Sequence, residues 1–184
     1  MRLCEIGEGI AEVMNSYEIE LNGKIKKIKP VKNLCGHTVG KYKVHAGKSV
    51  PCYNNGDNTK IEENEFYAIE TFASTGKGEV HRDLHVSHYM LNDSYDIKEI
   101  KGNKNKEFYN FIYNNFNTLA WCKRWIEELG FNNYFVPLRQ LINQSIVEEC
   151  PALYDVEGSF TSQFEHTFML KPTGKEIFTV GDDY

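Results

Sequence analysis

Two glutamates stand in the middle of otherwise apolar, alternating stretches of this chain, and both are candidates for metal chemistry. Glu165 lies in FTSQFEHTFML and Glu70 lies in YAIETFAS. Such alternation predicts β-strands, whose side chains point to opposite faces in turn. Burying a carboxylate in an apolar strand is costly unless its charge is compensated. An edge-strand position or an ion pair would explain one such glutamate. Neither stretch contains a Lys or Arg, and the occurrence of two favours a divalent metal ion, which prefers oxygen ligands.

Histidines in two further segments are candidate partners of these glutamates. His37 and His45 lie in NLCGHTVGKYKVHAGKSVP, which we expect to be an irregular, glycine-rich loop. His81, His85 and His88 lie in HRDLHVSHYM. Their spacing would suit zinc on a helix, but on a strand residues four apart lie about 13 Å from each other. We therefore interpret His81 and His85 as residues without a metal role, and a surface role would also explain each loop histidine alone.

The composition is that of a globular chain. Its 184 residues are 41% hydrophobic and 26% charged, with a net charge of −5, which suits one domain with a core or one domain with a small insertion. The acidic balance argues against nucleic-acid binding through bulk charge. Five cysteines without a CxxC pair are typical of free thiols in a reducing cytoplasm. No apolar run approaches the roughly 18 residues of a membrane span, and the acidic N-terminus lacks a signal-peptide core.

Periodicity predicts the elements that would position these side chains. Helical spacing predicts a helix over 4–17, and Asn22-Gly23 predicts a tight β-hairpin. Alternation predicts strands over three ranges, 65–75, 83–91 and the region from 155 onward. The STGKG segment lacks the spacing of a phosphate-binding loop, and we expect a turn there.

Helical spacing returns between these strands, so residues 93–148 are predicted to form a helical insertion in a β-rich body. Trp121 and Trp125 would lie one helical turn apart and should contact one neighbouring surface. A core position is the simpler interpretation of Trp125.

Taken together, the segments resemble the type 2 methionine aminopeptidases, metalloenzymes of the pita-bread fold. The resemblance covers nearly the whole chain, through NLCGHTVGKYKVHAGKSVP, YAIETFASTGKGEVHRDLHVSHYM, TLAWCKRW, GSFTSQFEHTFMLKPTGKE and GDDY. It implies an α+β fold with a curved, mainly antiparallel sheet. Residues 1–92 and 149–184 would form part of a pita-bread catalytic domain, and 93–148 the helical insertion subdomain that distinguishes type 2 from type 1 enzymes.

The resemblance also implies a metal site. His37, Glu70 and Glu165 match three ligands of a two-metal site, with Glu165 bridging two divalent ions (Co, Mn, Fe or Zn). Two ions about 3.5–4 Å apart would activate a water and stabilise a tetrahedral intermediate. The family also has two aspartate ligands and an active-site histidine that precede the matched segments. We therefore expect this chain alone to hold at most one ion well and to be a poor or inactive catalyst.

Substrate contacts follow from the same resemblance. His45 would be the catalytic histidine beside the scissile peptide bond, and His88 and Ala120 would line the pocket for the methionine side chain. The implied activity is removal of the initiator methionine from nascent proteins and peptides in the cytoplasm, with ribosome association and self-association as further expectations. A non-catalytic pita-bread protein that binds macromolecules is the alternative, and a prolidase-type peptidase is disfavoured by the insertion and the GDDY terminus.

Overall fold

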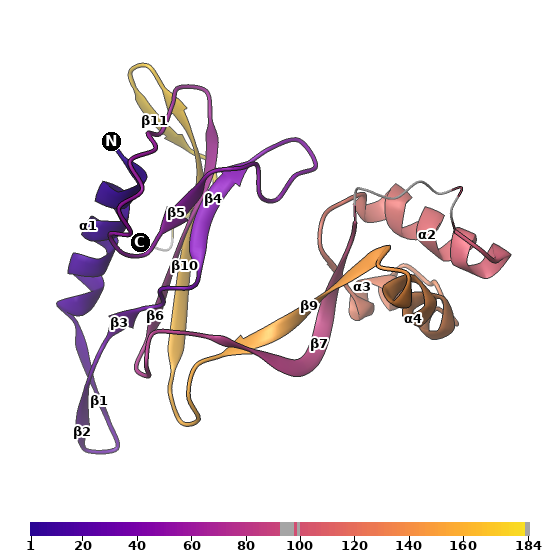
Figure 1. Cartoon of the computed structure of the whole chain (residues 1–184), viewed down its shortest axis with the longest axis horizontal. Coiled ribbons are helices and arrows are strands. Elements are labelled where there is room, and N and C mark those ends of the chain that lie inside the picture. Colours follow the sequence, from indigo (N-terminus) through magenta and orange to yellow (C-terminus); the bar gives the residue numbers. More distant parts are fainter. Residues whose placement is uncertain (93–97, 99, 183–184) are drawn as a thin grey trace. The chain divides into compact units, whose positions relative to one another are not determined.

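The computed structural model describes residues 1–92, 98 and 100–182. Residues 93–97 and 99 of the expected insertion, and 183–184 of the GDDY terminus, lie outside this description. The chain forms two compact units (Figure 1). Unit 1 comprises Met1–His81 and Tyr154–Tyr184, and unit 2 comprises Arg82–Leu153.

Unit 1 begins with helix α1 (Leu3–Asn15), which lies along one face of a sheet (Figure 1). Leu3 of the helix, Val50 and Tyr67 form a buried apolar cluster. Gly7 allows the close approach, because a Cβ at this position would lie 2.3 Å from a backbone carbonyl oxygen. The helix predicted over 4–17 is therefore confirmed, with both ends slightly earlier.

The predicted hairpin is also confirmed. Strands β1 (Glu18–Leu21) and β2 (Lys24–Lys27) pair in antiparallel fashion. Asn22 and Gly23 join them with φ values of 53° and 72°. Two consecutive residues with positive φ give the turn whose twist matches that of paired strands, which explains why Asn-Gly is found there.

A six-stranded sheet is the framework of unit 1. Its order is β11-β10-β6-β4-β5, with β3 also paired to β6, and its pairings are antiparallel. The bounds are β3 (Lys29–Pro30), β4 (Cys35–Val39), β5 (Ser49–Pro51), β6 (Phe66–Ser74), β10 (Thr161–Lys171) and β11 (Gly174–Ile177).

The expectation of an irregular loop around His37 was wrong, because His37 lies within β4 and pairs with Ala68 of β6. Gly36 explains the misleading glycine signal. A Cβ on Gly36 would lie 2.5 Å from the Ala68 carbonyl oxygen and 2.8 Å from the Glu70 backbone nitrogen. This glycine therefore allows two strands to approach each other closely and does not mark a loop.

The STGKG segment forms the expected turn, and the carboxylate of Asp155 organises it. Asp155 is 3% exposed. Its Oδ2 accepts hydrogen bonds from the Ser74 hydroxyl (2.7 Å) and the Gly78 backbone N–H (2.8 Å). Its Oδ1 accepts from the backbone N–H groups of Lys77 (3.0 Å) and Val156 (2.7 Å). A buried charge is therefore compensated by four donors.

Unit 2 contains both helices and strands. Three strands form a sheet in the order β8-β7-β9, and an apolar core includes Tyr89, Phe108 and Leu141. The elements are β7 (His81–Leu91), α2 (Asn103–Phe116), β8 (Trp121–Cys122), α3 (Lys123–Glu128), α4 (Phe135–Asn143) and β9 (Val147–Tyr154). In the described part of the chain, every helix is too short or too polar to span a membrane.

The two tryptophans occupy different positions from those expected. Both rings stack on Phe116, with centroid distances of 6.4 Å for Trp121 and 6.1 Å for Trp125, which confirms a shared neighbour. Assigning Trp125 to the core was wrong, because Trp125 is 39% exposed and Trp121 is 0% exposed. The helical pattern misled here because Trp121 lies in the short strand β8 and Trp125 in α3.

The chain leaves unit 1 at the start of β7 and re-enters it at the end of β9, and these two strand ends lie close together. The rings of His81, at the start of β7, and Tyr154, at the end of β9, have centroids 6.2 Å apart. The two ends of the long excursion between them are therefore close together.

Candidate metal centre

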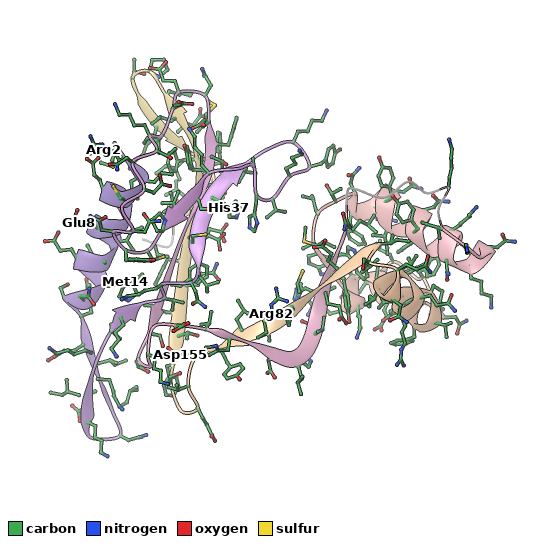
Figure 2. The ribbon with its side chains drawn as sticks, viewed as in Figure 1. Arg2, Glu8, Met14, His37, Arg82 and Asp155 are labelled. Atoms are coloured by element: carbon green, nitrogen blue, oxygen red, sulfur yellow. The ribbon has the colours of Figure 1, made fainter. Side chains whose placement is uncertain are left out.

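The register of three strands in unit 1 brings the predicted ligands to one face of the sheet. Glu165 of β10 lies directly opposite Glu70 of β6. His37 of β4, labelled in Figure 2, lies opposite Ala68, two residues before Glu70. Because side chains alternate along a strand, Ala68 and Glu70 share a face, and their cross-strand partners share it too.

His37 and Glu70 are in direct contact, with Nε2 of His37 2.9 Å from Oε1 of Glu70. His37 Nδ1 lies 3.1 Å from the carbonyl oxygen of Thr38. A carbonyl oxygen only accepts hydrogen bonds, so Nδ1 carries the proton and donates it. The Nε2–Oε1 contact then requires a second proton, on the imidazole or on the carboxyl group.

The hydrogen bonding of His37 is of the kind that a metal ligand would have. A metal-binding histidine commonly donates one ring N–H to a carbonyl group and offers its other nitrogen to the metal. In His37 the free nitrogen is Nε2, which points at the Glu70 carboxylate. A divalent ion would take the place of the second proton and compensate the charge of the largely buried Glu70 carboxylate.

Gln163 connects the two glutamates, and the sequence analysis missed it. Its Nε2 donates to Oε2 of Glu70 (3.1 Å) and to Oε2 of Glu165 (3.4 Å). Burial and the neighbouring Glu165 raise the pKa of Glu70, and His45 and Gln163 partly offset this effect. Gln163 lies two residues before Glu165, so the alternation that placed Glu165 on one face also places Gln163 there.

The expectation that Glu165 is buried was wrong, because its side chain is exposed. Strand β11 pairs with β10 only from Phe168 to Lys171. Among the described strands, the part of β10 that carries Glu165 therefore has β6 alone beside it. Glu70 lies on the inner strand β6, and its side chain is 17% exposed.

His45 lies beside His37, although it comes from the loop after β4. The two imidazole centroids are 4.1 Å apart, with an interplanar angle of 69°. Partial burial and the adjacent His37 lower the pKa of His45, and Glu70 partly offsets this effect. The lowered pKa favours the neutral form of the His45 imidazole near pH 7.

His88 and Ala120 belong to unit 2. His88 lies on β7 opposite Cys122, and its Nδ1 is 2.9 Å from the Ser87 hydroxyl. It lines a hollow of about 280 Å³ together with Ser87, Cys122, Lys123, Arg124 and Trp125. Ala120 is exposed at the residue before β8.

The structure thus joins His37, His45 and Glu70 by contact and places Glu165 beside Glu70. Within residues 1–92, 98 and 100–182, no group of three or more His, Cys, Asp and Glu side chains is arranged to hold a metal ion. The ligand role of His37, Glu70 and Glu165 remains a prediction.

Comparisons with solved structures define the fold class. A thermophilic Arx1 matches with a TM-score of 0.69 and 10% identity, over 95% of this chain and 56% of that one. A methionine aminopeptidase from Thermotoga maritima matches with a TM-score of 0.52 and 16% identity, over 98% and 43%. The chain therefore has an α+β fold of the pita-bread class. No protein-family model matches it.

Comparisons of sequence show which proteins this chain is similar to. Methionine aminopeptidase 2A of Arabidopsis thaliana is 50% identical over 186 residues, which is all of this chain and 42% of the plant protein. Methionine aminopeptidase 2 of Debaryomyces hansenii is 50% identical over all of this chain and 44% of its own length. The chain is similar to type 2 methionine aminopeptidases over its whole length, and it spans less than half the length of these relatives.

Proposed function

We propose that this chain contributes three metal ligands to a methionine aminopeptidase that removes the initiator methionine from nascent proteins and peptides. The observation that supports this most directly is the contact between His37 Nε2 and Glu70 Oε1, with Glu165 opposite Glu70. The identity of about 50% to proteins named methionine aminopeptidase 2 supports the same activity.

His37, Glu70 and Glu165 would hold the divalent cation, which is Co, Mn, Fe or Zn, and the complete family enzyme would hold two. When bound, the metal supplies Lewis-acid polarisation of the scissile carbonyl group and a nucleophilic water. The chain's own contribution is orientation. Thr38 fixes the tautomer of His37 through its carbonyl oxygen, and Gln163 holds one oxygen of each glutamate through its amide.

We assign substrate contacts to three residues. His45 would accept or donate a hydrogen bond at the scissile peptide, as its neutral ring allows. His88 and Ala120 would line the pocket for the methionine side chain. The aminopeptidase would work in the cytoplasm, where it meets nascent chains at the ribosome, without a membrane or nucleic-acid partner.

We further propose that these 184 residues alone are a poor catalyst. The family resemblance implies two aspartate ligands and a histidine in addition to the residues matched here. Phe160 and Phe164 are 62% and 68% exposed, and exposed aromatic side chains of this kind favour self-association.

The test is to add Mn²⁺ or Co²⁺ to the purified chain and to measure cation binding by calorimetry and cleavage of Met-Ala-Ser. We expect cation binding that Glu70→Gln weakens and that Glu157→Gln, at an exposed loop position, leaves unchanged. Cleavage is expected only when the N-terminal part of a relative is supplied separately. Full activity of the isolated chain would refute the view that further ligands are needed. An absence of cation binding would instead favour a non-catalytic binding protein, and cleavage of a dipeptide ending in Pro a prolidase.

A further inference from the structure

The segment that carries His45 is folded back onto the strand that carries His37. We call residues 40–48 the His45 loop. The backbone N–H of Thr38, on β4, donates to the Lys48 carbonyl oxygen (3.0 Å), and the Ala46 N–H donates to the Thr38 carbonyl oxygen (2.8 Å). The residue directly after His45 is therefore fixed to the residue directly after His37.

Thr38 couples the loop to the imidazole of His37. Its carbonyl oxygen accepts from both the Ala46 N–H (2.8 Å) and His37 Nδ1 (3.1 Å), so both of its lone pairs are used. Its hydroxyl oxygen accepts from the Lys48 N–H at 3.0 Å. A displacement of the loop at Lys48 would therefore disturb Thr38, the residue whose carbonyl oxygen orients His37.

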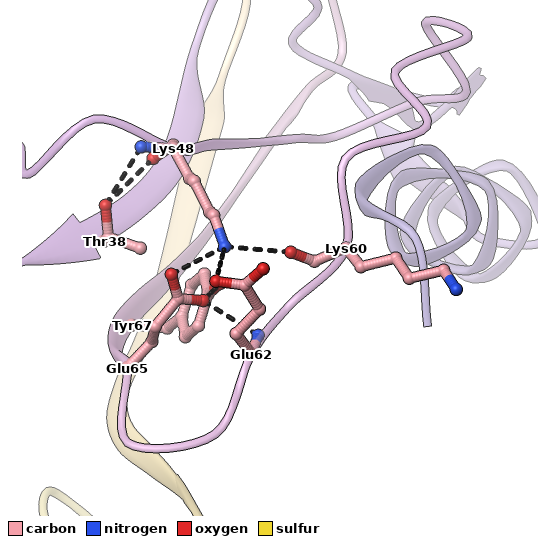
Figure 3. Close-up of polar contacts among 6 residues, drawn as sticks. All are labelled: Thr38, Lys48, Lys60, Glu62, Glu65 and Tyr67. Carbon is pink, nitrogen blue, oxygen red and sulfur yellow. Dashed lines mark hydrogen bonds and ion pairs between the residues drawn. The ribbon is translucent and has the colours of Figure 1, made fainter.

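The Lys48 ammonium group fastens the end of this loop (Figure 3). Its nitrogen lies 2.6 Å from Oε1 of Glu65, 3.3 Å from Oε2 of Glu62 and 3.0 Å from the carbonyl oxygen of Lys60. An ammonium group has three N–H donors, and these three acceptors satisfy all of them. The Lys48 side chain is 21% exposed, which limits competition by water.

The anchor continues into the core of unit 1. Oε2 of Glu65 accepts hydrogen bonds from the hydroxyl group of Tyr67 and from the Glu62 backbone N–H (2.9 Å). Tyr67 is 0% exposed and stacks on Phe168 of β10. The lysine therefore connects the loop to a fixed point of the sheet, which an isolated surface ion pair would not do.

We propose that Lys48 is a positioning residue that holds His45 against His37. It acts at a distance, through the backbone of Lys48, then Thr38, whose N–H bonds to Lys48 and whose carbonyl oxygen accepts from the Ala46 N–H. The importance of this for peptide cleavage rests on the proposed function, whereas the positioning of His45 does not.

The test uses the full chain without added metal, so that a failure of metal binding cannot affect it. With labelled histidines, NMR reports the proximity of the His37 and His45 rings through their nuclear Overhauser effect, and amide exchange reports the Ala46 N–H. Lys48→Met should abolish the ring-to-ring effect and raise Ala46 exchange by about tenfold or more. The exchange of β10 amides serves as the measure of intact folding.

Three further variants make the test specific. Lys60→Met is the matched control, because Lys60 takes part only through its carbonyl oxygen (Figure 3), and it should behave as the unaltered chain. Lys48→Arg should restore the ring-to-ring effect, since a guanidinium group also bonds to carboxylates. Glu62→Gln, at a side chain that is 71% exposed, should give a smaller change in the same direction and avoids any folding failure of Lys48→Met. The proposal would be overturned if both Lys48→Met and Glu62→Gln left the effect between the His37 and His45 rings and the Ala46 exchange unchanged. It would also be overturned if Lys48→Arg failed to restore the effect between the rings.

Discussion

Replacing Asp155 by asparagine tests how the turn between β6 and β7 is held. Asp155, labelled in Figure 2, accepts four hydrogen bonds, two at each carboxylate oxygen. Asparagine keeps one accepting oxygen and puts an NH₂ group in place of the other. Since that NH₂ group can only donate, two of the four donors lose their acceptor.

The hydrogen bonds and the pKa of Asp155 each indicate how much free energy of unfolding this substitution removes. A hydrogen bond to a charged group contributes about 1.5–3 kcal/mol, so losing two destabilises by about 3 kcal/mol or more. Burial alone would raise the pKa of Asp155, but bonds from the Ser74 hydroxyl and the backbone N–H groups outweigh it and lower the pKa from 3.8 to about 2. That lowering corresponds to about 2 kcal/mol near neutral pH. We therefore expect Asp155→Asn to lower the free energy of unfolding by about 2–4 kcal/mol.

The pH dependence gives the sharper check. Because the folded-state pKa is depressed, the stabilisation is present above the unfolded value of 3.8 and is lost as the pH falls toward 2. Urea unfolding followed by far-UV circular dichroism should thus separate variant and unaltered chain at pH 7 and bring them together near pH 2. Asp57→Asn is the control, because the bond that Asp57 accepts from the Thr59 N–H is exposed to solvent and an asparagine side-chain oxygen can accept it too. Equal stability of Asp155→Asn at pH 7, or a difference that persists at pH 2, would refute the reasoning.

Three further substitutions test the strand contact, the pocket and the exposed aromatic surface. Gly36→Ala would place a Cβ 2.5 Å from the Ala68 carbonyl oxygen. Urea unfolding should therefore show a loss of about 1–3 kcal/mol in the free energy of unfolding, and calorimetry should show a weaker affinity for Mn²⁺. An unchanged stability and affinity would contradict the close approach. Ala120→Leu should change stability by less than about 0.5 kcal/mol, because Ala120 is exposed, while titration with a Met-initiated peptide shows weaker binding. The opposite pattern would place Ala120 in the core. Phe164→Ser should reduce self-association in analytical ultracentrifugation, since Phe164 is 68% exposed, and unchanged association would exclude this surface.

Elements with a local cause could be predicted from the sequence. The Asn22-Gly23 hairpin follows from turn chemistry, and the strands that carry Glu70 and Glu165 follow from a period of two. The same period correctly predicts which neighbouring side chains share a face of the strand with each glutamate. The direct opposition of Glu70 and Glu165 is a matter of register, which no local pattern within either strand contains.

Features that depend on contacts between distant segments were missed or misjudged. The glycine beside His37 indicated a loop, whereas its role is to let β4 and β6 approach each other. The exposure of Glu165 depends on how far β11 extends along β10, which the alternation does not reveal. No role is predicted for Lys48 from the sequence, because a lysine in a loop is usually solvated. Only the folded structure brings Glu62 and Glu65 to its ammonium group.

The neighbouring ends of β7 and β9 bear on the order in which the chain folds. Pairing β6 with β10 requires closing a loop that contains about 70 residues of unit 2. The entropic penalty of closing a flexible loop grows with its length, and such distant contacts slow folding. If unit 2 folds first, its sheet brings His81 and Tyr154 together and replaces the long flexible loop by a short one. In that case the face that carries Glu70 and Glu165 would assemble after the inserted unit.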